Sequence, residues 1–214
     1  MTGKSTLFLT VAALVAGGAT AASALDFNLT SDHCTGGCGT APFGLVSVTQ
    51  NGANVDILVN LADGPPNTTS WAKTGAADFQ AFKFNATGVV LADITVDQTF
   101  AGQTLQAQAG TFNGDGTGNF GFGINCITCG NGFSGITSNI SFHVANATIA
   151  DLTAQNNLGN VFVADIFSSQ TGNTGPVDAT VPVPAPIVGA GLPGLLMACG
   201  GLLGFARRRR RQIA

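Results

Sequence analysis

Residues 43–61 read FGLVSVTQNGANVDILVNL and carry the clearest structural signal in the chain. From Asn54 to Leu61, apolar residues stand at every second position, which is the period of a strand that buries one face. Asn51 and Gly52 separate this segment from residues 43–50, and an Asn-Gly pair tolerates the positive φ angles of a tight turn. The pattern therefore predicts two antiparallel strands joined as a hairpin.

The same alternation extends outward from this hairpin, from Leu25 to about Gly175, and no segment shows a helical period. Only residues 148–156 are expected to form a short helical turn. Residues 161–168 are apolar on both faces, which predicts a central strand. Further strands are predicted at 79–85, 90–96, 104–112, 119–125 and 140–146. Short strands parted by Gly and Asn turns predict a single all-β domain, a β-sandwich over residues 25–175 with a jelly-roll or immunoglobulin-like strand order.

Phenylalanine is the main large apolar residue, with 15 Phe against one Trp and no Tyr. Rows of rings that bind sugars are usually built from Trp and Tyr, so we expect the Phe side chains to form the core. Trp71 is the residue that a carbohydrate-binding function would be expected to use. Six Phe residues fall at strand positions predicted to point inward: Phe82, Phe84, Phe120, Phe122, Phe142 and Phe162.

Charge is scarce and unevenly distributed, with 9% charged residues and a formal net charge of −3. Residues 25–186 hold two lysines, Lys73 and Lys83, against eleven aspartates, which gives a net charge of −9 without any Arg or Glu. We refer to residues 25–186 as the body of the protein. Its net negative charge means that nucleic acids and anionic membrane surfaces repel it. Its many Asn, Thr and Gln side chains instead suit hydrogen bonding to hydrated polysaccharide.

The first 24 residues have the order of a secretory signal peptide. Lys4 precedes an apolar run over residues 7–15, and Ala22-Ser23-Ala24 forms an A-x-A cleavage site. Polar Asp26 follows at once. We therefore expect the chain to be exported, with residues 1–24 removed.

The C-terminal end has three parts: a Pro-rich linker at 176–186, an apolar stretch at 187–206 and a basic tail at 207–214. A helix of about 20 residues rising ~1.5 Å per residue matches a hydrocarbon core of ~30 Å, so 187–206 is predicted to be a transmembrane helix in the precursor. The tail should stay in the cytoplasm, which leaves the body outside. Its basic cluster is Arg207, Arg208, Arg209, Arg210 and Arg211.

This ending resembles the PEP-CTERM sorting signal of Gram-negative bacteria, in which a short Pro motif, a Gly- and Leu-rich span and an Arg cluster follow one another. The resemblance covers residues 181–211. Where the family usually has an acidic residue between the prolines, this chain has Val or Ala, as in variants with a Val-Pro-x-Pro-Ala signal. The motif residues are Val181, Pro182, Val183, Pro184, Ala185 and Pro186.

The resemblance implies a temporary inner-membrane anchor that a membrane-embedded exosortase recognises and cleaves. The protein would then reach the cell surface or the exopolysaccharide matrix. The alternative is an ordinary single-pass anchor that is never cut.

Four cysteines lie in the predicted exported body and a fifth, Cys199, lies in the predicted span. An even number of cysteines outside the cytoplasm predicts disulfides, although the spacing leaves local and crossed pairings open. The C-x3-C and C-x2-C spacing, with His33 alongside, also approximates a four-thiolate zinc site, which we consider the less favoured alternative in an oxidising compartment. The candidates are Cys34, Cys38, Cys126 and Cys129.

No catalytic motif stands out. The chain has no G-x-S-x-G elbow, no H-E-x-x-H helix and no Glu, and His143 is predicted on the polar face of a strand. Residues 113–119 faintly resemble a calcium loop but lack its closing bidentate acid. We therefore expect no enzyme activity, no cofactor and no bound metal.

These observations predict an exported structural or adhesive protein of the cell surface or extracellular matrix, sorted by an exosortase and associated with exopolysaccharide. The alternative function is a carbohydrate- or calcium-binding extracellular module.

Overall fold

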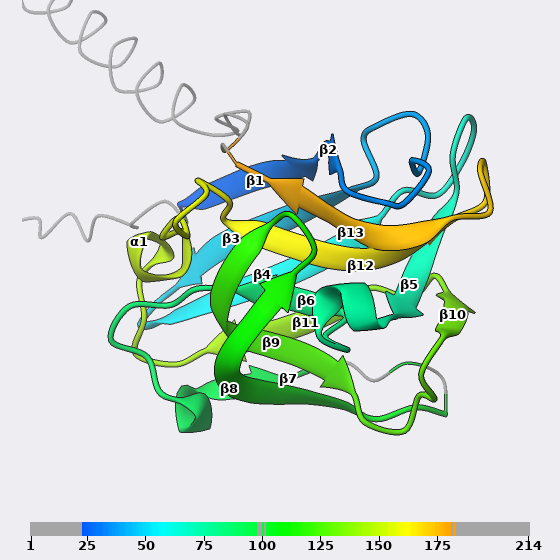
Figure 1. Cartoon of the computed structure of the whole chain (residues 1–214). Helices are drawn as coiled ribbons and strands as arrows, with labels where there is room; N and C mark the ends of the chain where they lie inside the picture. The colour runs from blue at the N-terminus through cyan, green and yellow to red at the C-terminus, as the bar shows by residue number, and fades with distance from the viewer. Residues whose placement is uncertain (1–22, 98–99, 101, 181, 183–214) are drawn as a thin grey trace, which may run out of the picture.

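A computed structural model of the chain describes residues 23–97, 100, 102–180 and 182. In these residues the protein is all-β and contains two antiparallel sheets (Figure 1). The smaller sheet has five strands, in the order β1 (Ala24–Leu29), β3 (Gly44–Asn51), β4 (Asn54–Leu61), β11 (Ile140–Val144) and β7 (Ile94–Val96).

The larger sheet has eight strands, and β12 (Phe162–Ser168) lies at its centre. One edge of β12 pairs with β13 (Thr174–Ala179), which also pairs with β2 (Ser31–Asp32). Two strands share its other edge end to end, β5 (Thr69–Lys73) and β6 (Phe82–Phe84). The sheet continues from β5 to β10 (Phe133–Ile136), and from β6 to β9 (Gly118–Cys126) and β8 (Leu105–Gly114).

The predicted hairpin is confirmed. Strands β3 and β4 pair in one unbroken register, from Gly44 opposite Leu61 to Asn51 opposite Asn54. Gly52 in the turn has a φ of 61°, a conformation that glycine adopts without steric cost. The predicted central strand is confirmed as well, because β12 has partners on both edges.

The core lies between the two sheets. Phe82 and Phe84 on β6 contact Phe142 on β11, with ring centroids 6.1 and 5.1 Å apart. Phe27 on β1 meets Phe162 on β12 edge to face at 5.0 Å. All six Phe residues predicted to point inward are buried, and five of them lie in the core; Phe120 does not, because its ring lies 5.8 Å from Lys83 Nζ, outside the core. Each buried Phe side chain contributes on the order of 1.5–3 kcal/mol to the free energy of folding.

Three short helical turns connect the strands: η1 (Gly75–Ala77), η2 (Leu91–Asp93) and α1 (Ile149–Leu152). Turn α1 confirms the predicted helical turn at 148–156, and Thr148 caps it by accepting a hydrogen bond from the Asp151 backbone N–H.

Three predicted boundaries are wrong. The strand predicted at 79–85 begins only at Phe82, because Asp78 and Phe79 have positive φ angles of 50° and 62° in the preceding turn. Residues 90–96 do not form one strand, because the Asp93 carboxylate accepts a hydrogen bond from the Val90 N–H and closes the η2 turn before β7 begins. The predicted domain end at residue 175 lies inside β13, so the linker cannot begin at 176. The apolar side chains of Val177 and Ala179 are buried in the core, and Pro176 sits in this strand without having to donate a hydrogen bond.

Within the described residues, no helix is long and apolar enough to cross a membrane. The predicted span at 187–206, the basic tail at 207–214 and Cys199 lie outside these residues. So do residues 1–22 of the predicted signal peptide and the whole predicted sorting motif except Pro182.

Candidate functional site

The four body cysteines form two local disulfides, Cys34–Cys38 and Cys126–Cys129, with sequence separations of 4 and 3. This pairing selects one of the open alternatives and leaves no free thiolate for the four-cysteine zinc site. Asp32 lies beside the first disulfide, where its two carboxylate oxygens accept the N–H groups of Cys34 and Cys38 at 2.9 and 2.7 Å. The carboxylate therefore holds the loop in place.

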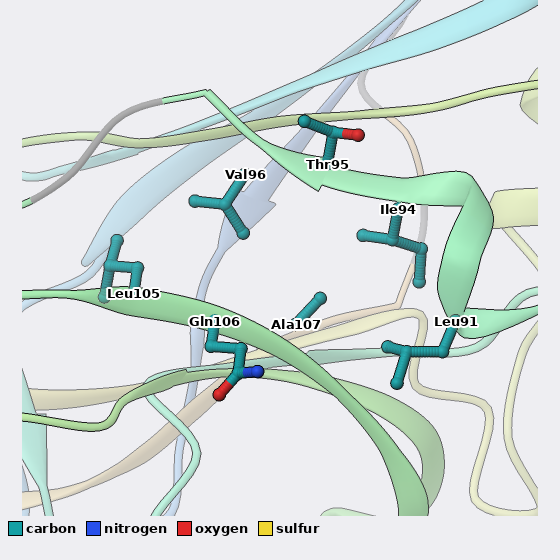
Figure 2. Close-up of a pocket in the computed structure, with 7 residues that line it drawn as sticks. All are labelled: Leu91, Ile94, Thr95, Val96, Leu105, Gln106 and Ala107. Carbon is teal, nitrogen blue, oxygen red and sulfur yellow. The ribbon is translucent and has the colours of Figure 1, made fainter.

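Two shallow clefts open on the surface. The cleft in Figure 2 has a volume of about 380 Å³ and lies between β7 and β8, the edge strands that face each other where the two sheets part. Five of the seven residues that line it are apolar, and the side chains of Thr95 and Gln106 point away from the space between the two strands (Figure 2). The second cleft, of about 340 Å³, runs along β3 and β4 and includes one carboxylate, Asp63. Neither lining holds an acid–base pair or an aromatic ring.

Trp71 is not available to stack on a sugar. It is 1% exposed, its ring stacks on Phe100 with centroids 6.1 Å apart, and its Nε1–H donates to the Ser138 carbonyl at 2.7 Å. The single tryptophan is therefore a core residue, and substituting it would report on folding.

The loop that resembles a calcium site is the tight turn between β8 and β9. Its polar groups bond to one another: the Asn113 side-chain amide donates to Asn119 Oδ1 at 2.8 Å, and the Thr117 hydroxyl donates to the Gly114 carbonyl at 3.0 Å. Among the residues that the structure describes, one group of metal-ligating side chains lies within reach of a common ion, and it is the disulfide group around Asp32.

Each of the two histidines pairs with an aspartate. His143 Nδ1 lies 2.7 Å from Asp97 Oδ1 on the surface, as expected for the polar face of a strand. His33 Nε2 lies 2.7 Å from Oδ2 of buried Asp178, the one acidic residue of β13. Burial raises the pKa of Asp178, while the attraction and hydrogen bond of His33 act in the opposite direction.

A buried polar cluster covers the outer face of the larger sheet, the face turned away from the core. It contains Lys83 on β6, Asp165 on β12 and Asp178 on β13, each no more than 1% exposed. The tip of the β8–β9 hairpin, residues 110–120, closes over this face (Figure 1). Its Asp115 N–H donates to the Ala76 carbonyl at 2.7 Å.

Close approach of the hairpin depends on glycine. A Cβ at Gly114 would lie 2.2 Å from Lys83 Nζ, and one at Gly116 would lie 2.8 Å from His33 Nδ1. On the far side of the tip, the side-chain amides of Asn156 and Asn160 donate to the Thr117 carbonyl at 2.6 and 2.9 Å. The tip is thereby held down on the polar cluster.

Burial in the cluster shifts the pKa values of Lys83 and Asp165, each toward the uncharged form of its side chain. Burial raises the pKa of Asp165 to about 6, although hydrogen bonds from Thr74 and the attraction of Lys83 act against that shift. Burial lowers the pKa of Lys83 to about 8, although Asp165 and Asp78 raise it. Lys83 Nζ has no hydrogen-bond partner among the residues that the structure describes, and the ring of Phe120 lies 5.8 Å away.

Sequence reasoning missed this cluster. The alternation Phe82-Lys83-Phe84 places the lysine side chain on the face of the strand that points away from the core. Lysine side chains are mostly exposed in proteins, so an exposed side chain is the expectation at this position. The covering hairpin tip comes from about 30 residues further along the chain. The signal that could have pointed to it is the run of Gly residues at 114, 116 and 118, which permits close backbone approach.

The body has no exposed Lys or Arg side chain, because its two lysines, Lys73 and Lys83, are both buried. Lys73 donates to the Cys126 carbonyl at 2.6 Å. The surface therefore presents carboxylates, amides and hydroxyls. No family model, curated protein or solved structure matches the chain.

Proposed function

We propose that this chain is an exported structural or adhesive protein that an exosortase sorts to the cell surface or the exopolysaccharide matrix. Its body would be a β-sandwich domain that is released from a temporary inner-membrane anchor. The Phe contacts between the two sheets support the sandwich architecture.

The observation that carries the proposal is the agreement between the limits of the fold and the two predicted processing sites. Strand β1 begins at Ala24, the last residue of the A-x-A site, and β13 ends at Ala179, two residues before Val181 of the sorting motif. Cleavage at either site would leave the strands of both sheets intact apart from one terminal pair, Ala24 with Thr49. Processing at both ends is thus compatible with the folded domain.

The surface and the disulfides support the same function. A surface without exposed Lys or Arg does not attract nucleic acid or anionic lipid, and it meets a hydrated polysaccharide through hydrogen bonds. Two disulfides suit an oxidising compartment outside the cytoplasm.

Fractionation of cells tests the proposal. The full chain is produced in a Gram-negative host with an exosortase for Val-Pro-x-Pro-Ala signals and in the same host without that enzyme. We expect the protein at the surface and in the matrix of the first host, and in the inner membrane of the second. The variant Pro182→Ala/Pro184→Ala should remain in the membrane of both, whereas Leu58→Ala, which changes an exposed body residue, should behave like the original chain. Identical distributions in the two hosts would contradict exosortase sorting.

A further inference from the structure

Lys83 and Asp165 are buried neighbours on adjacent strands. Strands β6 and β12 are antiparallel, and Lys83 stands opposite Val163, two residues before Asp165. Side chains two positions apart along a strand share one face, so Lys83 and Asp165 are diagonal neighbours within reach of a long side chain. Both are 0% exposed.

An ion pair does not account for these two side chains. Within the described part of the chain, Lys83 Nζ and Asp165 Oδ1 both lack a hydrogen-bond partner, although each is fully enclosed. A buried charged group without a partner is strongly unfavourable, and native proteins rarely keep two of them side by side. The burial of Lys83 and Asp165 next to each other therefore needs an explanation other than an ion pair.

The carboxyl group of Asp165 is held asymmetrically. Its Oδ2 accepts two hydrogen bonds from Thr74, one from the backbone N–H at 2.7 Å and one from the hydroxyl at 2.8 Å. Two donors on one oxygen polarise the Cγ–Oδ2 bond and stabilise the negative charge that develops there when a nucleophile adds to Cγ. Oδ1 is left unbound and free to depart.

The surroundings also shift both groups toward the protonation states that react. An amine attacks only when it is neutral, and a carboxyl group loses its oxygen as water only when it is protonated. Burial moves Lys83 and Asp165 in these two directions, and the hairpin tip with Phe120 encloses them.

We propose that Lys83 and Asp165 condense into an intramolecular amide that links β6 to β12. The Lys83 amine, which lies beneath Gly114 in the structure, swings on its four-carbon stem toward Asp165 and adds to Cγ. One amine proton passes to the protonated Oδ1, the Cγ–Oδ1 bond breaks, and one water leaves. Oδ2 remains as the amide oxygen and keeps both Thr74 hydrogen bonds. The reaction consumes no oxidant, reductant or cofactor.

The chain offers a direct test by trypsin digestion. Between Lys4 and Arg207, trypsin has only two sites, Lys73 and Lys83, and it does not cut after a lysine whose amine is in an amide. We expect the reduced and alkylated native chain to give a peptide that begins at Thr74, continues through Lys83 and is lighter than its sequence by one water. Complete cleavage after Lys83 with full peptide masses would overturn the proposal.

Substitutions of the individual residues identify which two side chains are linked. Asp165→Ala should restore cleavage after Lys83 and the full mass, whereas Asp165→Asn should still form the amide and lose one ammonia instead of one water. Lys83→Arg should restore cleavage at that position and the full mass. Thr74→Val, which removes the hydroxyl donor and keeps the N–H, should slow cross-linking by on the order of 100-fold. A linked peptide that persists in Asp165→Ala would contradict the assignment to Asp165.

Discussion

Around its central strands β6 and β12, the larger sheet is buried on both faces, yet the two faces are built from opposite chemistry. The inner face carries Phe82, Phe84 and Phe162, which pack against the smaller sheet. The outer face carries Lys83, Asp165 and Asp178 beneath the β8–β9 hairpin tip. Along β6, three consecutive residues are therefore fully enclosed, and the middle one is a lysine.

This difference shows that burial alone does not measure stabilisation. Moving an apolar ring out of water lowers the free energy of the folded state, whereas enclosing an amine and carboxylates raises it unless they find partners. The inner face therefore stabilises the domain, whereas the outer face holds the pair that we propose to be cross-linked. Substitutions on the two faces should separate these contributions.

The largest effect is expected at the centre of the inner face. Phe82→Ala removes a fully buried ring that contacts Phe84, Phe142 and Phe162, and should lower the free energy of unfolding by about 3–5 kcal/mol. Urea denaturation of the exported protein measures the loss. Leu58→Ala, at an exposed position of β4, is the control and should cost less than about 0.5 kcal/mol. Equal losses would contradict the placement of the core.

The disulfides come next. Each closes a loop of only a few residues, so a loop-entropy argument gives about 2 kcal/mol for each. The double variants Cys34→Ser/Cys38→Ser and Cys126→Ser/Cys129→Ser should each lower stability by that amount in urea denaturation, and their combination by roughly the sum. A loss above about 4 kcal/mol for one pair would point instead to a crossed bridge that closes a long loop.

A smaller effect is expected where the hairpin tip rests on the outer face. Gly114→Ala would place a Cβ 2.3 Å from the buried Thr117 Oγ1 in the tip itself, so either this hydroxyl loses its hydrogen bond to the Gly114 carbonyl or the tip shifts. We expect a loss of about 1–3 kcal/mol and faster hydrogen exchange in residues 110–120. Gly52→Ala is the matched control, because nothing lies within 4 Å of its Cβ and only its φ of 61° opposes the change. Unchanged exchange in the Gly114 variant would show that the tip does not seal the cluster.

The smallest effect concerns pH. Asp178 has a raised pKa because it is buried, so just above pH 3.8 the folded protein holds its proton more tightly than the unfolded chain does. The stability that Asp178 contributes is therefore fully present below pH 3.8. It declines as the pH rises from 3.8 through the raised pKa of the folded protein. In Asp178→Asn, the urea concentration at the unfolding midpoint should fall less steeply between pH 3.5 and pH 6 than in the original chain. In Asp97→Asn, which changes an exposed carboxylate, it should fall as steeply as in the original chain. A steeper decline in Asp178→Asn would reverse the sign of the argument.

The same comparison explains which features could be predicted from sequence. Alternation identified strand positions that face the core, including five of the six Phe residues expected there, because period two reports which side chains share a face. The exception is Phe120, which lies beside Lys83 outside the core. It missed β5, in which all five residues are buried, because a strand covered on both faces need not alternate.

The candidate site was harder to predict because its parts come from distant segments. Lys83, Asp165 and the hairpin tip meet only after the sheet has formed, and spacing along the chain gives no sign of their contact. The end of the domain was placed too early for a local reason, since Gly175 and Pro176 have the composition of a linker. Pairing with β12 and burial of Val177 outweigh that composition.

The most direct test of the proposed export and sorting is the identity of the two terminal peptides. Mass spectrometry of the protein recovered from the medium of an exosortase-bearing host should find a chain that begins at Leu25 and ends within residues 181–186. Its four body thiols should become alkylatable only after reduction. Recovery of Arg207 to Arg211 on the mature protein, or of an intact N-terminus before Leu25, would contradict the account.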